Sequence, residues 1–126
     1  MNPQFKRGIV ELCVMTLLAE EDMYGYAVIH TLSEHIDVGE NTIYPILRRL
    51  TEEGCFKTYL KDSRGGPARK YYTMTSKGFE HYLHLRASWD AFIGGVYHII
   101  HRGGKKHEDV FERFAERIEE DGSHRC

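Results

Sequence analysis

The segment that decides the fold is NTIYPILRRL, residues 41–50. Its large aliphatic side chains recur at the helical period and share one face: Ile43, Ile46, Leu47 and Leu50. Pro45 fits the first turn of a helix, where its missing N–H would have no partner, and Gly54 fits the position just past a helix end. The sequence therefore predicts a helix from residue 41 or 42 to about residue 53, which buries its aliphatic face and exposes its polar one.

Two helices are predicted before this segment. The first covers residues 4–19 and is apolar nearly all the way round, so most of its sides should be buried, one of them a candidate contact with a second subunit. The second covers residues 24–35, where apolar side chains repeat at helical spacing: Tyr24, Ala27, Val28 and Leu32. Residues 36–40, which include Gly39, form the turn that leads into the third helix.

The helical spacing of apolar side chains ends at Gly54. Residues 55–61 and 69–75 are rich in aromatic and other strand-favouring side chains, and the turn-forming sequence DSRGGPA, residues 62–68, lies between them. These features predict a two-stranded hairpin with a basic tip. Thr75 or Ser76 then caps a long helix that continues to about residue 101, in which Gly94 and Gly95 should each cost ~1 kcal/mol.

Two apolar stripes run along this long helix. The first has alternating spacings of three and four residues: Tyr82, Leu85, Trp89, Phe92, Val96 and Ile99. The second lies beside it: Phe79, Leu83, Ile93, Tyr97 and Ile100. A single domain of this size cannot cover both stripes, whereas a second copy of the chain can, so we expect a homodimer. A short amphipathic helix is expected beyond the linker at residues 102–106, from about residue 110 to residue 120.

The order of elements is helix, helix, turn, helix, hairpin and long helix. Short helices joined by a tight turn and followed by a basic hairpin are typical of a winged helix-turn-helix, which places its third helix in the DNA major groove. We expect a mainly α fold with a small β-hairpin. Residues 1–75 would form the winged helix-turn-helix DNA-binding domain, and residues 76–120 a long C-terminal dimerisation helix with an acidic tail.

The exposed face of the third helix carries side chains suited to double-stranded DNA: Asn41, Thr42, Tyr44, Arg48 and Arg49. Asparagine pairs with adenine, threonine contacts phosphate or a thymine methyl, tyrosine binds phosphate, and arginine reads guanine or phosphate. Any one of these residues could instead be an ordinary solvent-exposed side chain with no contact to DNA. Taken together with the basic hairpin that follows, the five residues favour DNA binding.

Charge is unevenly distributed along the 126 residues, whose formal net charge is −2. Residues 40–77 hold eight basic and four acidic side chains, whereas residues 107–126 hold three basic and seven acidic. The first segment should attract phosphate and the tail should repel it. No apolar run reaches the ~18 residues of a membrane span, and acidic residues rather than a cleavage site follow the apolar stretch 9–19. We therefore expect a cytoplasmic protein with no membrane partner.

Four motifs resemble the PadR family of bacterial transcriptional regulators: Tyr24-Gly25-Tyr26, Thr42-x-Tyr44-Pro45-x-Leu47, Gly66-Pro67-x-Arg69-Lys70-x-Tyr72 and Thr75-x-x-Gly78. The resemblance covers roughly residues 6–101. It implies a homodimer held together by the first and last helices, which represses a nearby operon and is released by a small molecule. A dimer with two linked recognition helices predicts a palindromic operator.

The resemblance also assigns individual positions. It makes Thr42, Tyr44, Pro45 and Arg48 recognition-helix residues, and makes Arg64, Arg69 and Lys70 wing residues. Tyr71 and Tyr72 are expected to brace the hairpin against the helices, although one of their hydroxyls could reach a phosphate.

Other kinds of site are weakly signalled. The pairs His81–His84 and His98–His101 have helical spacing for two metal ligands each, but no further ligand completes either set, so we predict surface histidines and no metal or other cofactor. No nucleophile elbow, phosphate loop or paired carboxylates indicate an enzyme. The cysteines lack ligand spacing and are expected to be reduced thiols: Cys13, Cys55 and Cys126.

Trp89 admits two interpretations. It packs the dimer interface, or it lines an apolar pocket for a flat hydrophobic aromatic effector together with Leu85, Phe92 and Val96. One alternative of another class stands against DNA binding as a whole. The protein could be a dimeric protein-interaction module of winged-helix fold that does not bind DNA.

Overall fold

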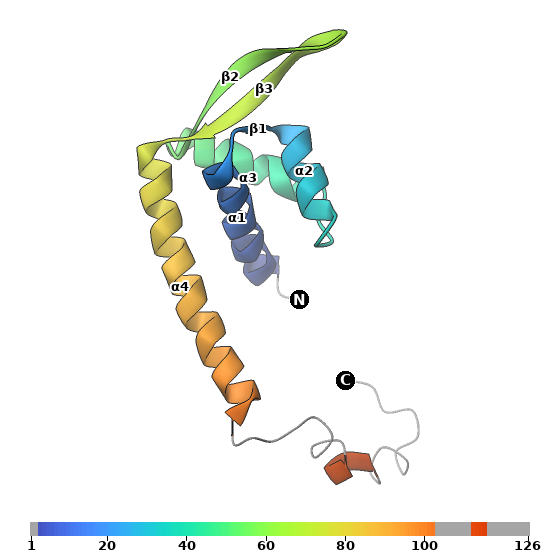
Figure 1. The fold of residues 1–126 in the computed structure, drawn as a ribbon, viewed down its shortest axis with the longest axis vertical. Helices are drawn as coiled ribbons and strands as arrows, with labels where there is room; N and C mark the ends of the chain where they lie inside the picture. Colours follow the sequence, from blue (N-terminus) through green and yellow to red (C-terminus); the bar gives the residue numbers. More distant parts are fainter. Residues whose placement is uncertain (1–2, 103–111, 116–126) are drawn as a thin grey trace. The chain divides into compact units, whose positions relative to one another are not determined.

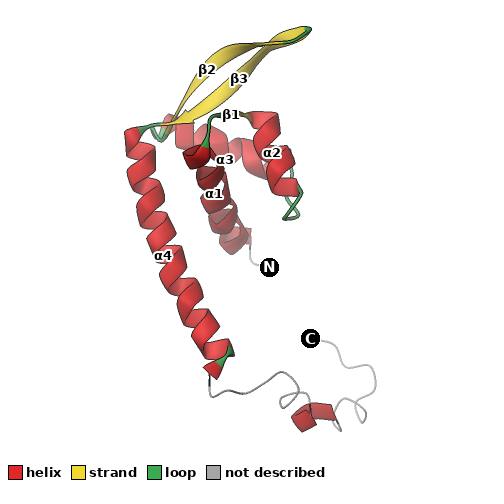
Figure 2. Ribbon diagram, in the orientation of Figure 1, coloured by secondary structure: helices red, strands yellow, loops and turns green. Residues whose placement is uncertain are grey.

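The computed structural model describes residues 3–102 and 112–115 of the chain (Figure 1). Its elements are α1 (Pro3–Glu20), β1 (Met23–Tyr24), α2 (Gly25–Ser33), α3 (Glu40–Glu52), β2 (Phe56–Ser63), β3 (Gly66–Met74) and α4 (Ser76–Ile100). The expected mainly α fold with a β-hairpin is confirmed (Figure 2). Of the expected terminal helix and acidic tail, only residues 112–115 are described, and they are helical; the rest lies outside the described residues.

The chain divides into two compact units, Met1–Ser88 and Trp89–Cys126, and α4 contributes residues to both. The core of the first unit lies where α1 packs against α2, α3 and β3. Its fully buried side chains come from all three helices and from the start of β2: Val10, Val14, Met15, Val28, Ile43, Leu47, Leu50 and Phe56. The predicted aliphatic face of α3 is thus part of the core.

α3 begins slightly earlier than predicted. The backbone N–H groups of Thr42 and Ile43 both donate to the carbonyl of Gly39 at 3.1 Å, so the helix already starts at Glu40. Pro45 consequently lies in the second turn, and its predicted place in the first turn was wrong. The proline removes one helical hydrogen bond. The aliphatic face compensates, because burying each such side chain contributes ~1.5–3 kcal/mol.

β1 is a strand that the sequence did not predict. Met23 and Tyr24 pair antiparallel with Tyr72 and Tyr71 of β3, which makes a three-stranded sheet of order β1-β3-β2. Tyr24 was expected inside the second helix, but it is extended and caps α2, which begins at Gly25. A strand of two residues has no alternation pattern of its own, because it exists only through its pairing with β3.

The hairpin of β2 and β3, the wing, extends away from α1–α3 (Figure 1). Pairing continues to Ser63 and Gly66, past an irregularity between Lys61 and Ser63. Only Arg64 and Gly65 remain in the turn, where Gly65 has a φ of 69°. The wide turn expected over residues 62–68 was therefore wrong, and Arg64 occupies the tip.

Hydrogen bonds join the first turn of α4 to the residues that directly follow α3. The Gly78 N–H donates to Thr75 Oγ1 at 3.0 Å, so of the two predicted caps it is Thr75 that caps the helix, and the Thr75 hydroxyl donates to the carbonyl of Gly54 at 2.7 Å. Lys77 Nζ donates to the carbonyl of Glu53 at 2.7 Å. A Cβ on Gly78 would lie 2.1 Å from the carbonyl oxygen of Cys55, so only glycine allows this approach.

The second half of α4 is helical through Gly94 and Gly95 and leaves large apolar side chains exposed: Phe92, Ile93, Val96, Tyr97, Ile99 and Ile100. None of the helices in the described part of the chain has the length and apolar character of a membrane span. Cys13 and Cys55 are free thiols whose pKa values are raised by burial. Cys126 lies outside the described residues.

Candidate nucleic-acid interface

A groove of about 530 Å³ lies between α3, the start of α2 and the base of the wing. Its lining comes from β1, α2, α3 and β3: Tyr24, Gly25, Tyr26, Tyr44, Arg48, Thr51, Glu52, Arg69, Lys70 and Tyr72. Four of the residues predicted to contact DNA are therefore brought together here: Tyr44, Arg48, Arg69 and Lys70. They come from α3 and β3, which are separated by 13 residues of chain, and the fold joins them into one surface.

Gly25 lets Tyr44 lie directly against the start of α2. A Cβ at Gly25 would be 2.8 Å from Cε1 of Tyr44 and 3.3 Å from its hydroxyl. The Tyr44 ring thus covers the first turn of α2, whose cap residue Tyr24 provides no side-chain hydrogen bond. The N–H groups at a helix start favour anions, and the Tyr44 hydroxyl lies beside this helix start.

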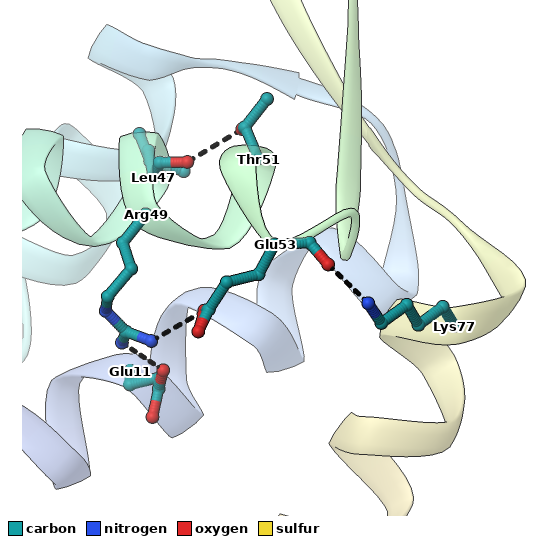
Figure 3. A network of polar contacts seen from close by, with 6 residues as sticks. All are labelled: Glu11, Leu47, Arg49, Thr51, Glu53 and Lys77. Atoms are coloured by element: carbon teal, nitrogen blue, oxygen red, sulfur yellow. Dashed lines mark hydrogen bonds and ion pairs between the residues drawn. The ribbon is translucent and has the colours of Figure 1, made fainter.

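Arg48 and Arg49 are neighbours on α3 with different surroundings. The Arg49 guanidinium is paired with the carboxylate of Glu11 on α1 and, at 2.9 Å, with that of Glu53 (Figure 3). The hydrogen bond to Glu11 raises the pKa of Arg49. Arg48 lines the groove and forms no ion pair with any other described residue.

The wing cations are also unpaired. Arg64, Arg69 and Lys70 are exposed and form no ion pair within residues 3–102 and 112–115. An unpaired cation is available to an anionic partner without first losing a carboxylate. Together with Arg48, these side chains give the wing and the groove a basic surface.

The remaining predicted residues do not line the groove. Asn41 and Pro45 are exposed and Thr42 is half-buried in the first two turns of α3, while Arg64 is at the tip of the wing. Arg49 is held against α1, which the helical pattern of α3 alone could not indicate. Its contact with DNA stays a prediction.

The sequence analysis placed Tyr24 on the apolar face of the second helix and predicted no DNA contact for Tyr24 or Tyr26, although both line the groove. Their rings stack with centroids 6.5 Å apart, and Tyr26 also stacks on His30 at 6.3 Å. The motif Tyr24-Gly25-Tyr26 is visible in the sequence, but the place of its tyrosines in the groove depends on the contact between Gly25 and Tyr44. Buried Tyr72 closes the groove from the core side, and burial raises its pKa.

The candidate effector residues are divided between the two units. Leu85 belongs to the first unit and is half-buried, whereas Trp89, Phe92 and Val96 belong to the second. The ring centroids of Trp89 and Phe92 are 6.4 Å apart. Within the described residues, no group of three or more His, Cys, Asp or Glu side chains could hold a metal ion.

Comparisons with known proteins agree with this geometry. A model of the transcriptional regulator PadR-like family matches residues 14–84. The structure of a PadR-like transcription factor from Bacteroides fragilis is 38% identical, with a TM-score of 0.65, over 76% of this chain and 94% of that chain. A PadR-like transcriptional regulator from Bacillus cereus is 34% identical, with a TM-score of 0.72, over 79% of this chain and 98% of that chain.

Sequence comparison adds a relative that spans most of the chain. An uncharacterised protein of Lysinibacillus sphaericus is 30% identical over 101 residues, which cover 71% of this chain and 93% of its own length. The family model and the solved structures agree on one assignment. The chain belongs to the PadR-like family of transcriptional regulators.

Proposed function

We propose that this regulator binds a palindromic operator as a homodimer and represses transcription until a small hydrophobic effector releases it. The observation that carries DNA binding is the groove itself, where Arg48 of α3 and Arg69 and Lys70 of β3 converge without a carboxylate partner. Only Glu52 brings a negative charge to the lining. Such a role would place the protein in the cytoplasm, with the DNA it regulates.

In this proposal, α3 enters the major groove with its exposed face. Asn41, Thr42 and Arg48 read base edges or the adjacent phosphates, while Tyr44 binds a phosphate at the start of α2. The wing, with Arg64 at its tip, follows the DNA backbone. In place of its predicted contact with DNA, we assign Arg49 the task of holding α3 on α1, because its guanidinium already contacts two carboxylates.

The dimer is proposed from the apolar surface of α4. Phe92 is 54% exposed and Ile99 is 64% exposed, which is unusual for such side chains on a folded monomer. A second copy would cover them and hold two recognition helices one helical turn of DNA apart. Residues 76–120 would then be the dimerisation segment and residues 1–75 the DNA-binding domain.

The dependence of operator affinity on salt tests DNA binding. About four phosphate contacts per protomer give about eight per dimer, so log affinity should fall against log salt with a slope of about −7. Between 50 and 200 mM salt, affinity should drop by about 10⁴-fold. Fluorescence anisotropy on DNA from upstream of the protein's own gene measures this. A slope shallower than about −3, or no binding, would favour the protein-interaction module instead.

Adjacent arginines provide the matched control. Arg48→Gln and Arg49→Gln each remove one charge from the same turn of α3. Arg48→Gln should weaken operator binding by ~1–3 kcal/mol and relax the preference at one base pair. Arg49→Gln should mainly lower the melting temperature, because it breaks the contacts with Glu11 and Glu53. Equal losses of affinity would place Arg49 in the interface after all.

We propose that the effector binds at Trp89, with Leu85, Phe92 and Val96 as further contacts, and thereby releases the protein from the operator. If Trp89 lines that pocket, Trp89→Ala should still bind the operator but no longer release it on addition of the effector. Because the chain has one tryptophan, quenching of its fluorescence by planar aromatic compounds reports binding directly. If Trp89 only packs the interface, dimerisation and operator affinity will fall together in the variant, and no compound will give a saturable signal.

A further inference from the structure

A row of tyrosines crosses the sheet at the base of the wing. Tyr59 on β2 and Tyr24 on β1 are both register partners of Tyr71 on β3, so the three side chains share one face. The ring centroids of Tyr59 and Tyr71 are 5.6 Å apart, and those of Tyr71 and Tyr24 are 5.5 Å apart. Tyr72 points to the opposite face and is buried against Phe56. The row is therefore separate from the core.

Two cations are held over this row. Lys61 and Arg69 are register partners on the same face, two residues nearer the tip than Tyr59 and Tyr71. Like charges directly opposite each other destabilise a hairpin, and neither cation has an ion pair in the described part of the chain. Lys61 Nζ lies 5.2 Å from the Tyr71 ring centroid, and Arg69 Cζ lies 4.5 Å from that of Tyr24. Separate rings thus engage the two charges.

Among the described residues, the one acidic group that contacts the row does not neutralise these cations. The Tyr59 hydroxyl donates to the carboxylate of Asp22 at 2.8 Å, and this hydrogen bond raises the pKa of Tyr59. Asp22 directly precedes β1, so the bond ties β2 to the segment that leads into α2. The row is thus fixed at one end, and Asp22 forms no ion pair with Lys61 or Arg69.

We propose that Tyr24 is a positioning residue for Arg69, and that its ring aims the Arg69 guanidinium at a DNA phosphate. This inference rests on the proposed DNA binding. Tyr24 and Arg69 both line the groove beside α3. A guanidinium that stacks on a ring keeps the N–H donors at its edge available for phosphate. Because the side chain is held in advance, it loses less conformational freedom when DNA binds.

A double-mutant cycle on operator binding tests the proposal. Tyr24→Leu alone should weaken binding of the dimer by about five- to thirtyfold, because each of its two protomers loses one exposed cation–π contact. In an Arg69→Gln background, Tyr24→Leu should cause no further loss, because the ring acts only through Arg69. Tyr24→Phe keeps the ring and should restore wild-type affinity. Additive losses, or a loss in Tyr24→Phe as large as in Tyr24→Leu, would overturn the inference.

Two further measurements separate positioning from a merely structural role. The salt slope should become shallower by about two per dimer in Arg69→Gln, which loses one phosphate contact per protomer. It should change in the same direction but by less in Tyr24→Leu, which keeps the Arg69 charge and loses its positioning. A structural role would lower the melting temperature and leave the slope unchanged. In the free protein, ring-current shifts of the Arg69 δ-protons should be present in the wild type and Tyr24→Phe and absent in Tyr24→Leu. Failure of the wild type to bind the operator would overturn the proposed function too, whereas additive losses in a binding-competent protein overturn this inference alone.

Discussion

Replacing Phe92 by glutamate should give a monomeric protein that no longer binds a palindromic operator. The Phe92 side chain is 54% exposed in the chain, next to exposed Val96 and Ile99 on the same stripe of α4. Burying side chains of this kind in a dimer contributes ~1.5–3 kcal/mol each, and a buried, unpaired carboxylate there costs several kcal/mol more. A monomer has one recognition helix, so it contacts one half-site and loses the affinity that linkage provides.

Ala87→Glu is the matched control for this variant. It adds the same charge to an exposed position of α4 that lies about 140° round the helix from Phe92. Sedimentation velocity should show a dimer for Ala87→Glu and a monomer for Phe92→Glu, and gel shifts should show operator binding only for the former. If Phe92→Glu remains dimeric, the interface does not use this stripe.

Gly78→Ala should destabilise the fold strongly, although alanine is the better helix former. The added Cβ would lie 2.1 Å from the carbonyl oxygen of Cys55 and 2.9 Å from its carbonyl carbon. Both are backbone atoms, so neither can move aside without shifting the turn between α3 and β2. Overpacking of this kind costs ~1–3 kcal/mol and sometimes more, which exceeds the ~1 kcal/mol that alanine gains over glycine in a helix.

Gly95→Ala is the control for this second variant. Gly95 is exposed in the same helix, and a Cβ there would meet nothing within 4 Å. Urea unfolding should therefore show a lower midpoint for Gly78→Ala and an unchanged or higher midpoint for Gly95→Ala. If the two variants unfolded alike, Gly78 would not be a close contact between α4 and the preceding turn.

The helices were predictable because their signals are local. The aliphatic face of residues 41–50, the cap at Thr75 and the stop at Gly54 each depend on neighbours within one or two turns. Two other features depend on partners far along the chain. β1 exists because two residues pair with β3, and Arg49 turns toward α1 because Glu11 lies there. No periodicity in either segment could have indicated these contacts.

The candidate site also has a part that was predictable from local sequence and a part that was not. Tyr44 and Arg48 follow from the polar side of one helix, and Arg69 and Lys70 follow from a basic hairpin. These four residues line one groove with Tyr24 and Tyr26. This arrangement depends on Gly25, because its lack of a side chain leaves room for the Tyr44 ring. The turn of the wing was expected to be wide because glycine, proline and serine favour turns, but strand pairing extended through them to Arg64 and Gly65.

The shortness of β1 has a consequence for how this protein avoids self-association through its sheet. Because β1 pairs only with Tyr71 and Tyr72, the rest of β3 presents a free edge, and β2 presents another along its whole length. Free edges invite pairing with a second chain, and lysine, arginine and proline oppose it. Pro67, Arg69 and Lys70 lie on the first edge, and Lys57 and Lys61 on the second. The charges proposed to attract DNA therefore also keep the wings of neighbouring molecules from adding to one another as strands.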